Sequence, residues 1–459
     1  MGAGIFGRVL LLTTVAAIPL EGLCQFESLN GGLSHIARCF EVSTDSAELI
    51  VGGSFKYTVQ DSLYANGLVG WNGNSWSIDG FAGGSGDTIP INETTGPLYS
   101  MALFQDTLFC AFGGPWQYDP SMQGAAYLAN GQWHGCGNPI VWFELMKVNG
   151  RLFSGGQATV VYGSYMPGIR EWTGGAWHQL PNMPPFNGIG TTECATYWHG
   201  QYYFAGSFIA GDALSVIAYD GMGQWSSLGE GVGGNWVRAI AGFGDSLFVG
   251  GYFLTGPHVQ SQHIQLWDGN SWKPFFSEVQ FDSQVFDMKV YQGALYICGN
   301  YHFTGESTQY GLLRYDGQHL CAIGGAMEQD NNKIVFFQGS LYLALGFTYP
   351  PLLNQCIGRL PLDGLVPDEC VTVAEIEEHG ANAQAVVFPN PASSEMTISY
   401  AGSNARSIEV VDILGRPVLR SAYTRSAPVI VDALANGTYT LRLYDAHGTA
   451  VAVGHFVKQ

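Results

Sequence analysis

The chain has 459 residues, of which 46% are hydrophobic and only 12% charged, and it contains 63 glycines and 23 tyrosines. This composition excludes a disordered or coiled-coil protein and is typical of a turn-rich, all-β globular protein. The formal net charge of −19, with no run of Lys or Arg, argues against nucleic acid and anionic lipid surfaces as partners, because both need a positive patch.

Residues 1–24 have the pattern of an export signal. Arg8 precedes the apolar run VLLLTTVAAIPL, which is too short to span a bilayer. Cleavage after Cys24 would leave Gln25 as the first residue and eight cysteines in the mature chain. No later segment is long and apolar enough to cross a membrane, so we expect no transmembrane segment and a mature chain that is soluble outside the cytoplasm.

A short aromatic motif recurs along the chain. In its first copy, LVGWNGNSWSIDG at residues 68–80, two tryptophans flank an Asn-Gly-Asn-Ser turn. Successive copies lie 43 to 58 residues apart, and their turn glycines are Gly73, Gly131, Gly174, Gly221, Gly269, Gly317 and Gly364. Self-similarity at this period predicts a β-propeller with one four-stranded blade per copy.

The fifth copy illustrates the expected order of strands within one blade. We expect strands at residues 237–243, 247–253, 264–267 and 271–275, from the axis outward. Six of the seven motif turns contain Asn-Gly or Asp-Gly, which predicts type I′ hairpins with positive φ at both central residues. The flanking tryptophans are expected to pack strands and blades together rather than to form a binding site.

Both ends of the repeat region contribute to the expected ring. The seventh copy ends in LPLDGLVPDEC without an outer strand, and QFESLNGG at residues 25–32 lines up with the segment QWSSLGEG at residues 224–231. We therefore expect the N-terminus to supply the missing strand, which leaves no open sheet edge. The prediction is a seven-bladed β-propeller over residues 25–370 and an acidic linker over residues 371–385.

The repeats VGGSF and WNGNSW resemble those of kelch-like and delta-60-type extracellular propellers. This resemblance covers about three quarters of the chain and implies a fold and a style of repeat. It implies no activity, because propellers host many unrelated functions.

Residues 386–459 form a predicted second domain. Short alternating strands between turn residues, such as TYTLRLY at residues 438–444, predict a small Ig-like β-sandwich. In the order of its motifs the segment resembles the type A C-terminal sorting domain of the type IX secretion system of Bacteroidota. The residues that carry this resemblance are Pro389, Asn390, Pro391, Gly415, Gly437 and Lys458.

The resemblance implies an export route and a partner. Such proteins cross the inner membrane by their signal peptide and the outer membrane through the type IX secretion machinery. They then lose the sorting domain and are released or anchored to surface lipopolysaccharide. The implied location is therefore extracellular or on the outer-membrane surface, and the propeller carries the function.

The sequence contains no motif of a familiar catalytic or metal site. HExxH, GxSxG, phosphate-binding glycine loops and EF-hand loops are absent, and the 11 histidines are scattered singly. We therefore expect no metal and no cofactor. An even number of cysteines in an exported chain predicts disulfides. The candidate pairs are Cys110–Cys136, Cys298–Cys321 and Cys356–Cys370, with Cys39 and Cys194 as candidates for buried free thiols.

The loops that vary between copies carry the first functional hypothesis, since rigid blades present their sites on connecting loops. PWQYDPSMQG and QATVVYGSYMPG connect the second and third strands of neighbouring copies and are expected on one face of the ring. Their aromatic side chains would form a platform that stacks on sugar rings, and these are Trp116, Tyr118, Tyr162 and Tyr165. The alternative, that these rings only pack the loops, stays open. The hypothesis is a monomeric, non-catalytic binding or adhesion module for glycans or surface partners.

Acidic loop residues carry a second hypothesis. A long insertion brings Asp87 and Glu93 toward the same face, and Glu230, Asp282 and Glu306 lie in comparable loops. Two carboxylates in a cleft can act as general acid and base, so the alternative is a glycoside hydrolase or lyase that cleaves polysaccharides. A third hypothesis is a passive surface-layer component.

Overall fold

A computed structural model of the chain describes residues 25–78, 97–112, 124–136, 143–157, 160–161, 164–165, 168–186, 190–233, 236–254, 261–327, 331–345, 356–372, 385–400, 402, 405–412, 417–425, 427–445 and 450–459. All the regular secondary structure in these ranges is β-strand, which confirms the predicted all-β class. No helix able to cross a membrane occurs in the same ranges. The export signal expected at residues 1–24 lies outside the described residues.

Seven strand groups, each an antiparallel set of four strands, account for most of the described chain. Groups 1 and 2 contain β2 (Ala37–Val42), β3 (Leu49–Gly53), β4 (Leu68–Trp71) and β5 (Trp76–Ser77), then β6 (Leu98–Phe104), β7 (Thr107–Phe112), β8 (Ala125–Ala129) and β9 (Gln132–Gly135). Groups 3 and 4 contain β10 (Phe143–Val148), β11 (Arg151–Gln157), β14 (Arg170–Thr173) and β15 (Ala176–Gln179), then β16 (Thr191–Trp198), β17 (Gln201–Ala210), β18 (Ala213–Tyr219) and β19 (Trp225–Ser227).

The remaining three groups follow the same order. Groups 5 and 6 contain β20 (Trp236–Phe243), β21 (Ser246–Tyr252), β22 (Ile264–Trp267) and β23 (Trp272–Pro274), then β24 (Val279–Tyr291), β25 (Ala294–Phe303), β26 (Tyr310–Tyr315) and β27 (His319–Ala322). Group 7 contains β28 (Asn331–Phe337), β29 (Ser340–Leu345), β30 (Ile357–Pro361) and β1 (Glu27–Ser28). A short hairpin, β12 (Val160–Val161) with β13 (Ser164–Tyr165), stands beside group 3. The strand boundaries expected for the fifth copy are confirmed to within two residues.

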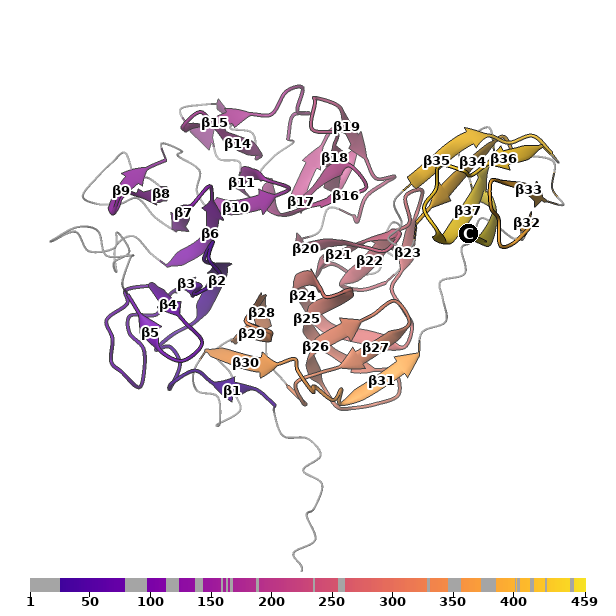
Figure 1. Cartoon of the computed structure of the whole chain (residues 1–459). Helices are drawn as coiled ribbons and strands as arrows, with labels where there is room; N and C mark the ends of the chain where they lie inside the picture. The colour runs from indigo at the N-terminus through magenta and orange to yellow at the C-terminus, as the bar shows by residue number, and fades with distance from the viewer. Residues whose placement is uncertain are drawn as a thin grey trace, which may run out of the picture.

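The seven groups follow one another around a ring (Figure 1). The first strand of each group is innermost, and these strands pack side by side in the closed order β2, β6, β10, β16, β20, β24, β28 and back to β2. A short pairing of β11 with β16 joins groups 3 and 4 into one eight-stranded sheet. β1 pairs with β30 through Glu27 opposite Arg359, so the expected contribution of the N-terminus to the last group is confirmed.

In groups 1 and 5 a motif tryptophan ties the group to its predecessor. Trp71 and Trp76 lie opposite each other on β4 and β5 with ring centroids 4.8 Å apart, and the Trp76 indole donates a hydrogen bond of 2.9 Å to the Leu29 carbonyl. In group 5 the Trp272 indole donates equivalently to the Leu228 carbonyl at 2.7 Å. Leu29 and Leu228 directly follow the outer strands of groups 7 and 4. The packing role predicted for these rings is confirmed.

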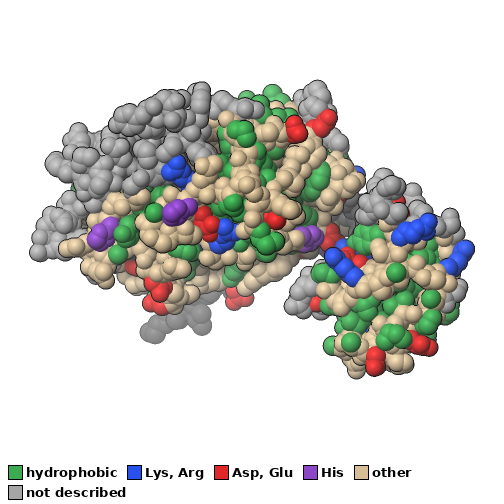
Figure 2. Space-filling view, turned by 90° about the horizontal axis from the view of Figure 1, so that it is seen from above, with side chains coloured by type: hydrophobic (Ala, Val, Ile, Leu, Met, Phe, Trp, Pro, Cys, Tyr) green, Lys and Arg blue, Asp and Glu red, His purple; other side chains and the backbone are tan. Residues whose placement is uncertain are grey.

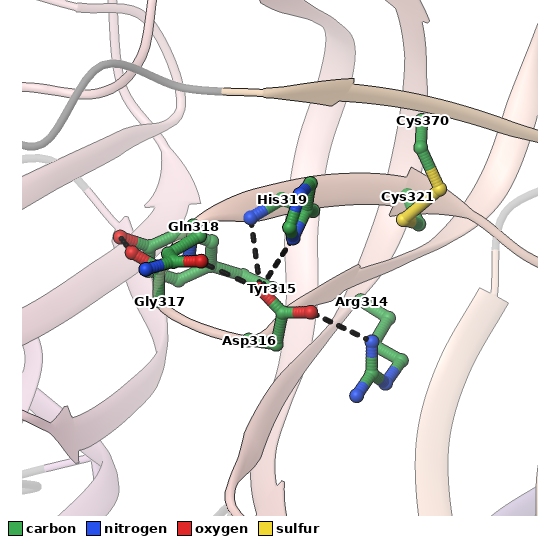
Figure 3. A network of polar contacts seen from close by, with 8 residues as sticks. All are labelled: Arg314, Tyr315, Asp316, Gly317, Gln318, His319, Cys321 and Cys370. Carbon is green, nitrogen blue, oxygen red and sulfur yellow. Dashed lines mark hydrogen bonds and ion pairs between the residues drawn. A yellow bond between two sulfur atoms is a disulfide. The ribbon is translucent and has the colours of Figure 1, made fainter.

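The type I′ prediction is wrong for several Asn-Gly and Asp-Gly turns. At Asp316-Gly317 only the glycine has positive φ, because the turn is four residues long and the Asp316 carboxylate closes it. This carboxylate accepts hydrogen bonds from the backbone N–H groups of Gln318 (3.0 Å) and His319 (2.8 Å), and pairs with Arg314 at 3.3 Å (Figure 3). Asn72, Asp220 and Asp268 accept backbone hydrogen bonds in the same way. In these turns the hydrogen bonds of the Asn or Asp side chain close the turn, so only the glycine needs a positive φ.

Two predicted disulfides are wrong. Group 6 gains a fifth strand, β31 (Glu369–Thr372), which pairs with β27 and places Cys370 opposite Cys321. These two cysteines form a disulfide (Figure 3), so neither Cys298–Cys321 nor Cys356–Cys370 exists. The predicted pairs joined cysteines that are close in sequence, whereas β31 brings Cys370 back to Cys321 across a sequence separation of 49 residues. β31 also extends two residues into the segment assigned to the linker.

The other described cysteines form no disulfide, which contradicts the proposed Cys110–Cys136 pair. Cys39, Cys110, Cys136 and Cys298 are buried, and Cys194 and Cys356 are half-buried. Burial raises the pKa of Cys136 to about 12 and the pKa of Cys110 well above its usual range. These thiols stay protonated and are unsuited to nucleophilic chemistry.

The C-terminal unit, residues 385–459, has two sheets around its own core, which includes Met396, Leu441 and Phe456. One sheet contains β32 (Val386–Phe388), β33 (Glu395–Ser399) and β36 (Pro428–Ile430), and the other contains β35 (Pro417–Ala422), β34 (Ser407–Val411), β37 (Gly437–Tyr444) and β38 (Ala450–Lys458). Figure 2 shows this unit as a smaller lobe beside the ring, with several Lys and Arg side chains on the face in view. Arg442 of this lobe forms an ion pair with Asp245 of the ring.

Candidate ligand-binding site

A cavity of about 290 Å³ lies among the seven innermost strands, at the start of every one except β24. Each of these strands contributes one side chain to its wall, namely Arg38, Tyr99, Glu144, Glu193, Arg238, Phe286 and Lys333, with Gly156, Thr191 and Trp236 completing the lining. We call this space the central cavity. It combines three cationic, two carboxylic and three aromatic side chains, which is an unusual mixture for a site buried among strands.

A repeated irregularity of the backbone places most of these side chains. In six innermost strands the pairing with the second strand skips one residue, and the skipped residues are Arg38, Tyr99, Glu193, Arg238, Phe286 and Asn332. A β-bulge of this kind leaves the extra residue unpaired and changes the direction of its side chain. Five of the six skipped residues line the central cavity.

Glycines on the second strands make room for these bulges. Gly53, Gly206 and Gly251 lie opposite the residue before the bulge in their groups. A Cβ atom on Gly251 would overlap the carbonyl oxygen of Trp236, and one on Gly206 would overlap that of Thr191. The sequence signal of the site is therefore the recurring glycine in VGGSF, FAGSF and VGGYF, with the cavity residue lying 13 to 15 residues earlier.

One side of the cavity joins an aromatic ring to a carboxylate and a guanidinium. Trp236 is 44% exposed, and its indole N–H donates a hydrogen bond to Glu193. The guanidinium of Arg238 lies 4.6 Å from the centroid of the Trp236 ring and 5.8 Å from that of Phe286. The Thr191 hydroxyl also donates to Glu193, at 3.3 Å. These contacts hold the Trp236 ring in place while nearly half of this residue's surface stays accessible.

A second arginine lies at the wall formed by groups 1 and 2. The guanidinium of Arg38 stands 5.1 Å from the centroid of the Tyr99 ring, and its Nε donates a hydrogen bond of 3.0 Å to the Ser54 hydroxyl. Groups 1 and 5 are separated by groups 6 and 7 on one side of the ring, so Arg38 and Arg238 approach the cavity from different directions.

The charges in the cavity perturb one another. Burial raises the pKa of Glu144 to about 7. Repulsion from Glu193 raises this pKa further, whereas the positive charge of Lys333 lowers it. Burial also raises the pKa of Glu193, against its hydrogen bond from Trp236 and the charge of Arg238. The pKa of Lys333 is raised despite its burial, because Asp287, Glu144 and Glu193 favour its charged form. The cavity is thus a coupled set of charges, which is common at functional sites.

The structure leaves the predicted aromatic platform undescribed. Trp116, Tyr118 and Tyr162 lie outside the described residues, and Tyr165 ends β13 with no described side chain. Phe112, the last described residue before the segment that contains Trp116, pairs with Leu98, which precedes Tyr99 of the cavity. The central cavity therefore adjoins the attachment points of these loops.

The predicted acidic residues are not those that line the cavity. Asp87 and Glu93 lie outside the described residues, and Glu230, Asp282 and Glu306 are exposed. Asp282 instead contacts His302 at 2.9 Å and accepts a hydrogen bond from Gln309 at 3.2 Å. The carboxylates that do meet are Glu144 and Glu193, which the sequence reading missed. Within the described ranges, no group of three or more His, Cys, Asp or Glu is arranged to hold a metal ion.

The sorting-motif residues of the C-terminal unit attach its first strand to its last. The Asn390 side chain accepts a hydrogen bond from the Val457 N–H at 2.9 Å and donates one to the His455 carbonyl at 3.2 Å. Gly437 pairs with Lys458, whose side chain is 7% exposed and donates to the carbonyl of Gln459. Pro389 and Pro391 flank Asn390, and Gly415 lies outside the described residues.

A family comparison identifies this unit. The family model of the secretion system C-terminal sorting domain matches residues 386–456, so the predicted sorting domain is confirmed. This domain directs export by the type IX secretion system to the cell surface or the extracellular space, where the tail is removed. It also implies an interaction with the type IX secretion machinery. The chain matches no curated protein.

Solved structures resemble the chain only distantly. PorZ, an essential surface component of the type IX secretion system of Porphyromonas gingivalis, is 12% identical with a TM-score of 0.36, over 92% of this chain and 65% of PorZ. A fungal alcohol oxidase of the AA5 family, solved with copper, is 12% identical with a TM-score of 0.39, over 95% of this chain and 99% of the oxidase. Thus the chain spans about 65% of the PorZ structure. Similarities of this size identify neither a fold nor an activity.

Proposed function

We propose that residues 25–372 form a seven-bladed, monomeric β-propeller that the type IX secretion system delivers outside the cell. Three features support the propeller: seven four-stranded groups, the closed order of their innermost strands, and the pairing of β1 with β30. A ring closed by strands from both ends of the repeat region exposes no free sheet edge. Such a body survives as a separate unit once the sorting domain has been removed.

The function we propose for this propeller is non-catalytic binding of a glycan through the central cavity. The observation that carries the proposal is the Trp236 ring, half of it accessible, with a carboxylate and a guanidinium beside it. Sugars present an apolar face and a rim of hydroxyl groups, so an aromatic face bordered by charged hydrogen-bonding groups is complementary to them. The cavity of about 290 Å³ lies at the lower limit of sites for drug-sized ligands, which suits one sugar residue at a chain end.

Substitution of Trp236 tests this proposal. We expect Trp236→Ala to weaken retention on a glycan array and the affinity for any retained glycan by about tenfold or more, through the loss of stacking area. The matched control is Tyr197→Ala, because Tyr197 is 42% exposed and lies on β16, the strand of Glu193, but does not line the cavity. Equal binding by the wild-type and Trp236→Ala proteins would contradict the proposal.

A second candidate function is cleavage of a polysaccharide by the same cavity. Glu144, whose pKa is raised to about 7, and Glu193 lie in one cavity, and carboxylates with different pKa values are suited to act as general acid and base. This candidate predicts that reducing ends or unsaturated sugars accumulate with time and that Glu144→Gln abolishes them. Retention of a glycan without released product favours binding, whereas a protein inactive in both assays would have a passive surface role.

A further inference from the structure

We propose that the central cavity selects a sugar residue that carries a carboxylate, with Arg38 and Arg238 as its anion-binding side chains. This inference rests on the proposed function and narrows it from glycans in general to acidic glycans. It depends on three observations: the distribution of charge over the ring, the contacts of the two arginines, and the burial of a guanidinium nitrogen.

The first observation is the concentration of positive charge at the axis. Between residues 25 and 372 the chain has 28 acidic and only 11 basic residues. Three of these 11 basic side chains, Arg38, Arg238 and Lys333, line one cavity of about 290 Å³. A body with so strong a negative charge repels anions from much of its surface, whereas the central cavity has three cationic side chains against two carboxylates, so an anion is more favoured there.

The second observation is that the two arginines are not neutralised by ion pairs. Arg151, Arg314 and Arg359 of the ring each pair with a carboxylate within 3.3 Å. Neither Arg38 nor Arg238 forms an ion pair with a carboxylate of the described residues, and both guanidiniums stand over aromatic rings instead. Stacking of this kind orients the planar guanidinium and leaves its edge available for a carboxylate.

Lys333 differs from the arginines in this respect. Its charge is stabilised by Asp287, Glu144 and Glu193, whose carboxylates lie around it. Lys333 is therefore largely balanced by the protein itself. The arginines form no direct ion pair within the described part of the chain, although Glu144 and Glu193 also attract Arg238. Their planar guanidiniums can pair with a ligand carboxylate in two parallel hydrogen bonds and so recognise that group by its geometry.

The third observation concerns Arg238 alone. Its Nε atom is buried and has no hydrogen-bond partner within the described residues. A buried donor without an acceptor is costly, and among the described residues that line the central cavity only Arg238 has such an atom. A rotation of the guanidinium toward the cavity on binding would bring this Nε to a carboxylate of the ligand, while the neighbouring Trp236 ring holds the sugar ring.

The test compares matched sugars on the whole purified protein by isothermal titration calorimetry. The probes are the methyl glycosides of glucuronic acid, galacturonic acid and glucose, with glucose 6-sulfate as an anion of different geometry. We expect at least one uronic acid to bind about tenfold or more tightly than glucose, because hydrogen bonds to a charged group are the stronger ones. Arg238→Gln and Arg38→Gln should each reduce uronic acid affinity by about tenfold and change glucose affinity by less than twofold.

Controls separate recognition from folding and from net charge. Lys273→Gln removes one positive charge from β23, outside the cavity, and should leave all affinities unchanged. Arg238→Lys keeps the charge but not the planar fork, so an intermediate loss is expected. Melting temperatures equal to that of the wild type show that the variants are folded.

The outcomes distinguish this inference from the proposed function. Equal affinity for glucose and both uronic acids, or an equal loss for neutral and acidic sugars in Arg238→Gln, would overturn the inference and leave glycan binding standing. Tighter binding of glucose 6-sulfate than of either uronic acid would overturn the assignment of a carboxylate. Binding of none of the four probes, with full retention of other ligands by Trp236→Ala, would overturn both.

Discussion

The central cavity and the C-terminal unit hold their characteristic side chains in opposite ways. Every wall of the cavity comes from a different strand group, and residues such as Arg38 and Lys333 are almost 300 positions apart. In the C-terminal unit, Asn390 and its two neighbouring prolines simply attach one short segment to β38. The cavity therefore depends on the integrity of the whole ring, whereas the sorting motif depends only on its own small core.

Substitution of a glycine beside a bulge tests this difference most directly and has the largest expected effect on stability. Gly251→Ala would place a Cβ against the carbonyl oxygen of Trp236, beside the bulge that presents Arg238. We expect the free energy of unfolding of the ring to fall by about 3 kcal/mol, since neither backbone can move away without breaking the bulge. Urea denaturation followed by tryptophan fluorescence measures this change.

Gly437→Ala is the matched control in the C-terminal unit. A Cβ on Gly437 would lie 3.8 Å from the Tyr439 ring, which is an ordinary contact. We expect a change of less than about 1 kcal/mol in the unfolding of that unit. If Gly251→Ala is equally mild, the bulges do not require their glycines, and the comparison between the two regions fails.

This difference also explains how much the sequence could reveal. Motif turns about 48 residues apart predict the strands of group 5, since turn chemistry is local, and composition predicts the all-β class. The contribution of the N-terminus is predicted by the missing outer strand of the last copy and by the likeness of residues 25–32 to residues 224–231. The Pro-Asn-Pro segment is also local, and the sorting domain was recognised from it and from its neighbouring motifs. Glu144 and Glu193 were missed because carboxylates one strand group apart meet only after the ring has closed.

The bulges leave a further signal in the sequence. The glycine in VGGSF and VGGYF follows a cavity residue at a nearly constant distance, and this distance is the length of one hairpin.

The disulfide between Cys321 and Cys370, in contrast, has no local signal in the sequence. Their disulfide depends on the return of β31 to group 6, a step of topology that neither spacing nor composition encodes.

The disulfide gives the next largest effect. It closes a loop with a sequence separation of 49 residues and attaches β31 to the ring where the chain leaves toward the C-terminal unit. Cys370→Ser should lower the free energy of unfolding of the ring by about 2–4 kcal/mol, because the unfolded chain gains freedom. The C-terminal unit should unfold as before. Differential scanning calorimetry resolves the two transitions, and a shift of the smaller transition alone would contradict this prediction.

Asn390→Ala should affect only the C-terminal unit. The substitution removes the hydrogen bonds to Val457 and His455 at the surface, so we expect a loss of about 1 kcal/mol in the stability of that unit. The melting temperature of the ring should not change. Because β38 is then less firmly held, the fraction of protein secreted should fall, as measured by blotting culture medium and cells. Asn270→Ala, at an exposed position of the motif turn of group 5, is the control for loss of an asparagine.

The smallest expected effect is a dependence of stability and of uronic acid affinity on pH, caused by Glu144 in the central cavity. Burial raises the pKa of Glu144 from its usual range to about 7, so its proton is bound more tightly in the folded chain. The stabilisation from this proton is complete below about pH 4.5 and is lost as the pH rises through 7. The same loss of a proton adds negative charge beside Arg238, so the affinity for a uronic acid should fall about threefold between pH 6 and 8. Glu144→Gln should remove the pH dependence of both the stability and the uronic acid affinity. Glu306→Gln, at an exposed carboxylate, should leave both pH dependences intact. If the wild-type affinity does not change between pH 6 and 8, Glu144 is already ionised at pH 6 and the prediction is wrong.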